Sequence, residues 1–145
     1  MKALVVEDDN FQSKIAVTML NMFVENGQID AAFDCQSARE KVKNTDYDII
    51  FMDYGLPDGN GADLTREFRK NGVKSKIYVL SGNWDKISDD VWREAGFDGG
   101  SFKPLSSERT QAYVDAFNHN ALDQLPWDNS YPHIPDEDKS EASRH

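Results

Sequence analysis

Side chains that could share one chemical site stand at widely separated places in this sequence. Glu7 and Asp8 follow the apolar segment ALVV, and Asp53 follows the apolar segment IIFM. Ser81 follows IYVL, and Lys103 lies in the segment FKP. Carboxylates brought together repel one another unless a cation intervenes, and such oxygen-rich sites suit Mg²⁺. A lysine and a hydroxyl beside the metal could stabilise added phosphoryl oxygens, while a metal-polarised carboxylate could act as a nucleophile. Together these residues would form a Mg²⁺-dependent aspartyl-phosphate site.

The segments in front of these side chains have the length of β-strands. Residues 3–6, 49–52 and 77–80 lack polar alternation, which is typical of parallel strands covered on both faces. Two more strands are predicted at residues 29–33 and 98–102. The last of these is a weak strand signal because it contains paired glycines.

Amphipathic stretches separate these strands. In the first of them, apolar residues recur every four positions from Phe11 to Phe23, and Gly27 is expected to stop the helix. Further helices are predicted at Ser37–Lys43, at Ala62–Lys70 ending at Gly72, at Lys86–Ala95 ending at Gly96, and at Ser106–Leu122. The alternation predicts an α/β fold, a (βα)5 doubly wound five-stranded parallel sheet.

The strand order decides which segment ends meet. In a flavodoxin-like sheet of order 2-1-3-4-5, the crevice opens at the carboxyl ends of strands 1 and 3, and strands 1, 3, 4 and 5 are contiguous. Their ends carry the acidic run, Asp53, Ser81 and Lys103. The second strand lies at the far edge, so Asp34 and Cys35 need not contribute to the pocket.

The chain resembles the receiver domain of two-component response regulators over roughly residues 1 to 122. VVEDD resembles the acidic pair after the first strand, which maps to Glu7 and Asp8. MDYGLPDGNG resembles the phosphoacceptor segment, with Asp53 as the acceptor. LSG resembles the hydroxyl position at Ser81, and FKP resembles the lysine position at Lys103. Each motif alone is weak, but their combination is highly specific.

The resemblance implies a role for each matched residue. Asp8 and Asp53 would bind Mg²⁺ directly with the backbone carbonyl of Gly55, and Glu7 would hold metal-bound waters. Lys103 would contact the phosphoryl group, and the peptide bond that joins it to Pro104 is expected to be cis. The implied partners are a histidine kinase or a histidine phosphotransfer protein as donor, and a downstream protein target.

Each residue also has a plain structural explanation. The acidic run could cap the first helix, Asp53 could close a turn, Ser81 could be an ordinary turn residue, and Lys103 could be a solvated surface lysine. The coincidence of four suitable chemistries at four strand ends, in order, argues against these explanations.

Three rival sites fit the sequence poorly. A flavodoxin needs a hydroxyl- and glycine-rich phosphate loop after the first strand, where EDDN would repel a phosphate. A phosphatase of the haloacid dehalogenase type needs a second acid two residues after its nucleophile, and Gly55 occupies that place. A P-loop is excluded because the motif GxxxxGK[ST] does not occur.

One position departs from the receiver pattern. Receivers usually carry Tyr or Phe three residues before the lysine, and that aromatic ring moves inward on activation, but this chain has Gly100 there. Phe102, on the same strand face, or Trp84 is expected to fill the volume. We expect the loop from Gly82 to Trp84, together with the fourth helix, to move instead.

Composition excludes several classes of function. The 145 residues include 26 acidic and 16 basic side chains, a net charge of −10, which disfavours nucleic-acid binding. Apolar runs are too short for a membrane span, and the acidic N-terminus does not fit a secretory signal. A single cysteine excludes an internal disulfide. We expect a cytoplasmic bacterial protein that is a monomer or weak dimer.

The chain is expected to contain a receiver domain at residues 1–123 and an acidic, proline-containing tail at residues 124–145, part of which could dock on a surface. No output domain is recognisable. The expected function is therefore a single-domain response regulator, which is not an enzyme but assists its own phosphorylation and dephosphorylation. The alternative is a phosphorylation-independent protein-binding module with a receiver fold.

Overall fold

The apolar segments without polar alternation form the interior of a parallel sheet. The computed structural model describes residues 1–82 and 89–125. Its central sheet contains β1 (Lys2–Val6), β2 (Gln28–Ala32), β3 (Ile49–Asp53), β6 (Lys76–Ser81) and β7 (Gly99–Phe102), in the order β2-β1-β3-β6-β7. All neighbouring pairs are parallel. The predicted fold class and strand order are confirmed.

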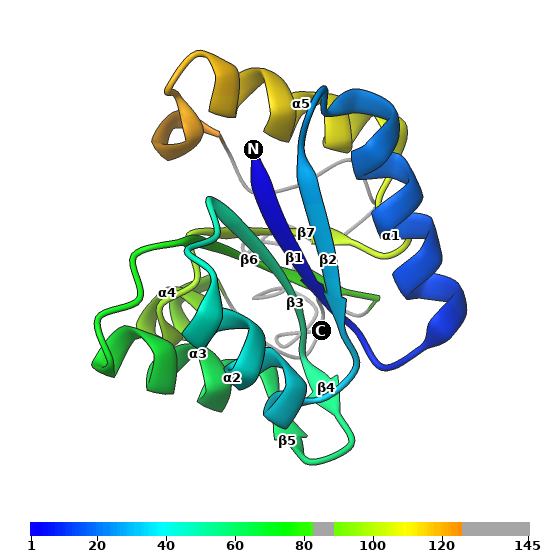
Figure 1. Ribbon diagram of the computed structural model, residues 1–145. Coiled ribbons are helices and arrows are strands. Elements are labelled where there is room, and N and C mark those ends of the chain that lie inside the picture. Colours follow the sequence, from blue (N-terminus) through cyan, green and yellow to red (C-terminus); the bar gives the residue numbers. More distant parts are fainter. Residues whose placement is uncertain (83–88, 126–145) are drawn as a thin grey trace, which may run out of the picture.

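Helices cover both faces of this sheet, which is why its interior strands are apolar throughout (Figure 1). One face packs against α1 (Asn10–Phe23) and α5 (Ser107–Asn118). The other packs against α2 (Cys35–Asn44), α3 (Gly61–Lys70) and α4 (Asp89–Ala95). A short 3-10 helix, Leu122–Gln124, follows α5. The described residues contain no helix that is both long and apolar enough to cross a membrane.

The buried face of α1 differs from the one indicated by the four-residue spacing. Ser13, Ala16 and Leu20 are buried, whereas Phe11 is 70% exposed. Because an α-helix has about 3.6 residues per turn, residues four apart drift by about 40° at each step and leave the core-facing side. A mixed spacing of three and four stays on one side, and the buried residues follow it.

One predicted helix stop and one predicted helix end are wrong, and two glycine stops are confirmed. The first helix ends at Phe23, the last residue of its apolar pattern, but the following turn uses Asn26 (φ 54°) rather than Gly27 as the left-handed residue. The last helix stops at Asn118 instead of Leu122, because Asn120 adopts φ 53°, a conformation that asparagine tolerates. Gly72 and Gly96 do take left-handed conformations just after α3 and α4.

A small antiparallel hairpin that the sequence did not predict lies directly after β3. It consists of β4 (Gly55–Leu56) and β5 (Gly59–Asn60), joined by Pro57 and Asp58. Strands of two residues leave no periodic pattern, so neither could be read from the sequence. The predictions for Trp84, for residues 86–88 of the fourth helix and for nearly all of the tail lie outside the described residues.

Candidate functional site

The chemically interesting side chains stand at one edge of the sheet because the strands are parallel. Glu7 and Asp8 follow β1, and Asp53 is the last residue of the neighbouring β3. Ser81 ends β6, and Lys103 follows β7. The backbone amide of Lys103 donates a hydrogen bond to the carbonyl of Ser81 at 3.0 Å, which holds these two strand ends together.

Three carboxylates form a cluster at this edge. Glu7, Asp8 and Asp53 each offer one carboxylate oxygen, and these oxygens lie within 4.8 Å of one another. Glu7 and Asp53 are buried, while Asp8 is exposed. Hard divalent cations prefer such oxygen donors, so the cluster could hold a metal ion.

Lys103 already supplies a positive charge to two of these carboxylates. Its Nζ donates hydrogen bonds to Glu7 Oε1 at 2.9 Å and to Asp53 Oδ1 at 3.0 Å. Burial alone would lower the pKa of Lys103, but the hydrogen bonds to both carboxylates outweigh it and raise the pKa. The lysine therefore stays charged and links β7 to β1 and β3.

Glu7 is the carboxylate that resists ionisation. Burial raises the pKa of Glu7, and a hydrogen bond with Asp53 raises it further, while Lys103 offsets this only in part. Repulsion between neighbouring carboxylates acts in the same direction. A cation at the cluster would offset the energetic cost of the buried negative charge and the repulsion between the carboxylates. The donor set therefore fits Mg²⁺.

The acidic run EDD divides its tasks between the site and the first helix. Asp9 caps α1 by accepting a hydrogen bond from the Gln12 amide at 2.9 Å, and its own amide donates to Glu7 Oε2 at 3.2 Å. The capping explanation therefore holds for Asp9, whereas Glu7 and Asp8 contribute to the carboxylate cluster.

Gly61 is a site-forming residue that the sequence analysis missed. A Cβ there would lie much closer than 3.0 Å to the carbonyl oxygen of Asp53, a separation that real Cβ atoms essentially never show. The Gly61 amide also donates to the Tyr54 carbonyl at 2.6 Å. Only glycine lets α3 begin so close to Asp53, and the two glycines of GNG were a possible signal. By contrast, a Cβ at Gly55 would meet nothing within 4 Å.

The two glycines of β7 face opposite layers. Gly99 pairs with Tyr78, whose ring would lie 3.1 Å from a Cβ at Gly99, so the tyrosine ring uses that space. Phe102, on the same strand face as Gly100, is 8% exposed and belongs to the buried cluster that also contains Trp92. The Lys103–Pro104 peptide bond is cis, as predicted.

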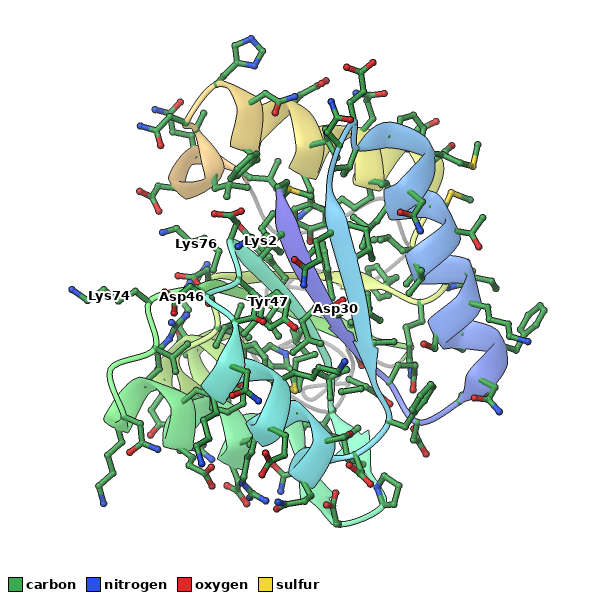
Figure 2. The ribbon with its side chains drawn as sticks, in the orientation of Figure 1. Lys2, Asp30, Asp46, Tyr47, Lys74 and Lys76 are labelled. Carbon is green, nitrogen blue, oxygen red and sulfur yellow. The ribbon has the colours of Figure 1, made fainter. Side chains whose placement is uncertain are left out.

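A separate hollow lies at the opposite edge of the sheet, where the strands begin, away from the cluster of Glu7, Asp8 and Asp53. It has a volume of about 520 Å³, and its lining includes Tyr47 before β3, Lys74 before β6 and Lys76, the first residue of β6. Figure 2 shows these side chains with Lys2 and Asp30, and the Tyr47 hydroxyl donates to Asp30 Oδ2 at 2.6 Å. The site residues instead follow the strands, so this hollow is not part of their site.

Comparisons with known proteins agree with this geometry. Residues 3–115 match the model of the response regulator receiver domain. The two-component response regulator PhoP of Pseudomonas aeruginosa is 36% identical over 120 residues, which cover 80% of this chain and 51% of that protein. The transcriptional regulatory protein CutR of Streptomyces coelicolor is 30% identical, with coverage of 87% and 57%. The chain thus spans about half the length of these relatives.

Solved structures show the same architecture. A two-component response regulator from Clostridium difficile superimposes with a TM-score of 0.74 at 27% identity, covering 82% of this chain and 96% of that one. A CheY-like receiver domain from Methylobacillus flagellatus gives a TM-score of 0.71 at 24% identity, covering 80% and 97%, and supports the fold alone.

Proposed function

Since this chain belongs to the family of response regulator receiver domains, we propose that Asp53 accepts a phosphoryl group in a Mg²⁺-dependent reaction. The donor is the phosphohistidine of a histidine kinase or histidine phosphotransfer protein. The phosphorylated chain signals by binding a downstream protein or by passing the group on. One observation supports this most directly: Lys103 Nζ lies 3.0 Å from Asp53 Oδ1 at an edge shared with two further carboxylates.

The proposed reaction is a phosphoryl transfer between side chains. A carboxylate oxygen of Asp53 attacks phosphorus, an O–P bond forms, and the P–N bond breaks. The imidazole of the donor histidine leaves with the electron pair of that bond. Lys103 and the Ser81 hydroxyl then stabilise the oxygens of the new acyl phosphate. These roles of Lys103 and Ser81 are predictions that follow from their strand-end positions.

The carboxylates that would hold Mg²⁺ are Asp8 and Asp53, with the Gly55 carbonyl as a third ligand and Glu7 acting through water. Bound Mg²⁺ would offset the negative charge of the carboxylates and of the incoming phosphoryl oxygens. Asp53 is 6% exposed, whereas Asp8 in the same cluster is exposed. A donor would therefore approach the Asp53 oxygens from the side of the cluster on which Asp8 faces solvent.

The chain would act as a phosphoacceptor and not as an enzyme with a separate substrate. Because its own lysine and carboxylates supply the reactive environment, it would assist its own phosphorylation and dephosphorylation. Histidine kinases draw on ATP, so we place the exchange in the cytoplasm. A single-domain organisation stays a prediction.

The phosphorylation-independent binding module remains a second candidate because of Gly100. A glycine has no side chain that could change position on phosphorylation of Asp53. The fold could therefore bind a partner whether or not Asp53 is phosphorylated. The two candidates differ in whether the chain binds Mg²⁺ with beryllofluoride, an analogue of the phosphoryl group.

Intact-protein mass spectrometry tests the proposed acceptor. Incubation with acetyl phosphate and Mg²⁺ should add one phosphoryl group to the wild-type chain and none to Asp53→Asn. Asp46→Asn is the matched control, because Asp46 is an exposed acid at the opposite edge of the sheet. Undiminished labelling of Asp53→Asn would show that another residue is the acceptor.

A further inference from the structure

The hairpin after Asp53, residues 55–60, is tied to a helix that is distant in sequence. At its tip, Asp58 Oδ1 accepts a hydrogen bond from the Cys35 amide at 2.7 Å, and Asp58 Oδ2 accepts one from the Gln36 amide at 3.1 Å. These amides are the first two of α2 and have no partner within the helix. The next amide, that of Ser37, donates to the helix's own cap, Asp34, at 2.7 Å.

The hairpin also covers the cysteine at the start of α2. Cys35 is 2% exposed, and its Sγ would lie 3.1 Å from a Cβ at Gly59 in the hairpin. Burial, helped by the neighbouring Asp58, raises the pKa of the Cys35 thiol to about 11. The thiol is therefore shielded and protonated at neutral pH as long as the hairpin stays in place.

On its other side the hairpin is fixed to the phosphoacceptor strand and to α3. Gly55 pairs with Asn60 across the hairpin, and the Asn60 side chain caps α3 by accepting from the Asp63 amide at 2.8 Å. Gly61, the next residue, packs against the carbonyl of Asp53. The hairpin thus links Asp53 to both α3 and α2, and Asp58 makes the contact with α2.

We propose that Asp58 is a positioning residue for the metal site. By holding the hairpin against the N-terminus of α2, it fixes the backbone carbonyl of Gly55, which lies three residues before it. This inference rests on the proposed function, in which that carbonyl is a Mg²⁺ ligand. It also requires reciprocity: if the held hairpin favours the metal, the bound metal must hold the hairpin more tightly over Cys35.

The competing explanation is that Asp58 merely caps α2, and the matched pair Asp58→Ala and Asp34→Ala separates the two. Each substitution removes one carboxylate from the N-terminus of the same helix, but Asp34 contacts its own helix rather than the hairpin. Calorimetric titration of the full chain with Mg²⁺ should give a dissociation constant raised at least about fivefold for Asp58→Ala. The constant for Asp34→Ala should match that of the wild type.

Thiol labelling provides an independent measurement because Cys35 is the sole cysteine of the chain. The reaction of the wild type with Ellman's reagent should slow on addition of Mg²⁺. In Asp58→Ala it should be faster and insensitive to Mg²⁺, while Asp34→Ala should keep the Mg²⁺ effect. Asp58→Asn retains one acceptor oxygen and should fall in between, and it replaces the alanine variant if that chain does not fold.

Equal Mg²⁺ affinities for wild type and Asp58→Ala, or equal losses in both alanine variants, would reduce Asp58 to a helix cap and overturn the proposal. A wild-type chain that binds no Mg²⁺ would overturn the proposed function together with this inference. The first result leaves phosphorylation of Asp53 intact, so the two failures are distinguishable.

Discussion

The ammonium group of Lys103 lies between two buried carboxylates and makes their proximity tolerable without a metal. Glu7 directly follows β1, Asp53 ends the neighbouring β3, and both are buried. Two such carboxylates would repel each other strongly if no cation were near. Lys103 is thus a structural residue before phosphorylation and, in the proposed function, a ligand of the phosphoryl group after it.

Replacement of Lys103 by Ala should therefore destabilise the chain. The free energy of unfolding should fall by about 2 kcal/mol, less than the ~3–5 kcal/mol typical of fully buried pairs, because the lysine is partly exposed. Mg²⁺ should restore part of this loss by supplying the missing positive charge. Urea unfolding with and without Mg²⁺ measures both effects. Lys74→Ala, on an exposed loop, is the control, and an equal loss in both variants would contradict the structural role of Lys103.

Asp8 offers the clearest test of the metal at the residue scale. Mg²⁺ at ten times its dissociation constant should raise the free energy of unfolding by about 1.4 kcal/mol. Asp8→Ala should lose most of this gain, while its metal-free form should be at least as stable as the metal-free wild type, because one repelling charge is gone. Thermal melts across a Mg²⁺ titration measure this, with Asp46→Ala as control. A wild-type melting curve that millimolar Mg²⁺ leaves unchanged would count against the metal site.

At the scale of elements, the start of α3 has the tightest steric requirement near the site. Gly61 packs on the carbonyl of Asp53, while Gly55, also in the segment after β3, faces open space. The same chemical change at these two glycines should therefore have different consequences.

Gly61→Ala should lower the free energy of unfolding by about 1–3 kcal/mol, because the added methyl forces α3 away from the strand. It should also weaken Mg²⁺ binding, since Asp53 must shift with its own carbonyl. Gly55→Ala should leave both quantities close to the wild-type values. Denaturant unfolding and calorimetric Mg²⁺ titration of the pair check this prediction, and indistinguishable variants would refute it.

In the proposed function, the whole molecule would transmit the phosphorylation state of Asp53 to a partner surface without an aromatic side chain at residue 100. Phe102 is built into the core cluster that also contains Trp92 of α4. A change at the carboxyl edge can reach α4 from the end of β6 as well as through this cluster. Coupling of this kind is typically worth about 1–3 kcal/mol.

Backbone NMR should detect this transmission. Addition of beryllofluoride and Mg²⁺ should shift the amide resonances of Gly82 and of α4 (Asp89–Ala95), in addition to those next to Asp53. The amides of Thr45 to Asp48, at the opposite edge of the sheet, are an internal control and should stay in place. Shifts confined to the immediate ligands would indicate a rigid receiver whose phosphoryl group is recognised directly by the partner.

The sequence by itself determined the fold class and the edge at which the site forms. Interior strands of a parallel sheet must be apolar on both faces, so residues 3–6, 49–52 and 77–80 were recognisable without any tertiary information. Parallel strands end at a common edge, and this alone brings the side chains after them together. The glycines after α3 and α4 were equally readable, because a left-handed turn favours glycine.

Tertiary structure decided which neighbour each side chain meets. It assigned Asp9 to a helix cap and Glu7 to Lys103, although both acids stand in one run. It turned Phe11 to solvent and placed Gly61 against Asp53. It also joined Asp58 to α2 across 22 and 23 residues of chain. Local propensity and periodicity describe a segment alone, whereas these contacts depend on how two packed segments are oriented, and that follows only from the assembled core.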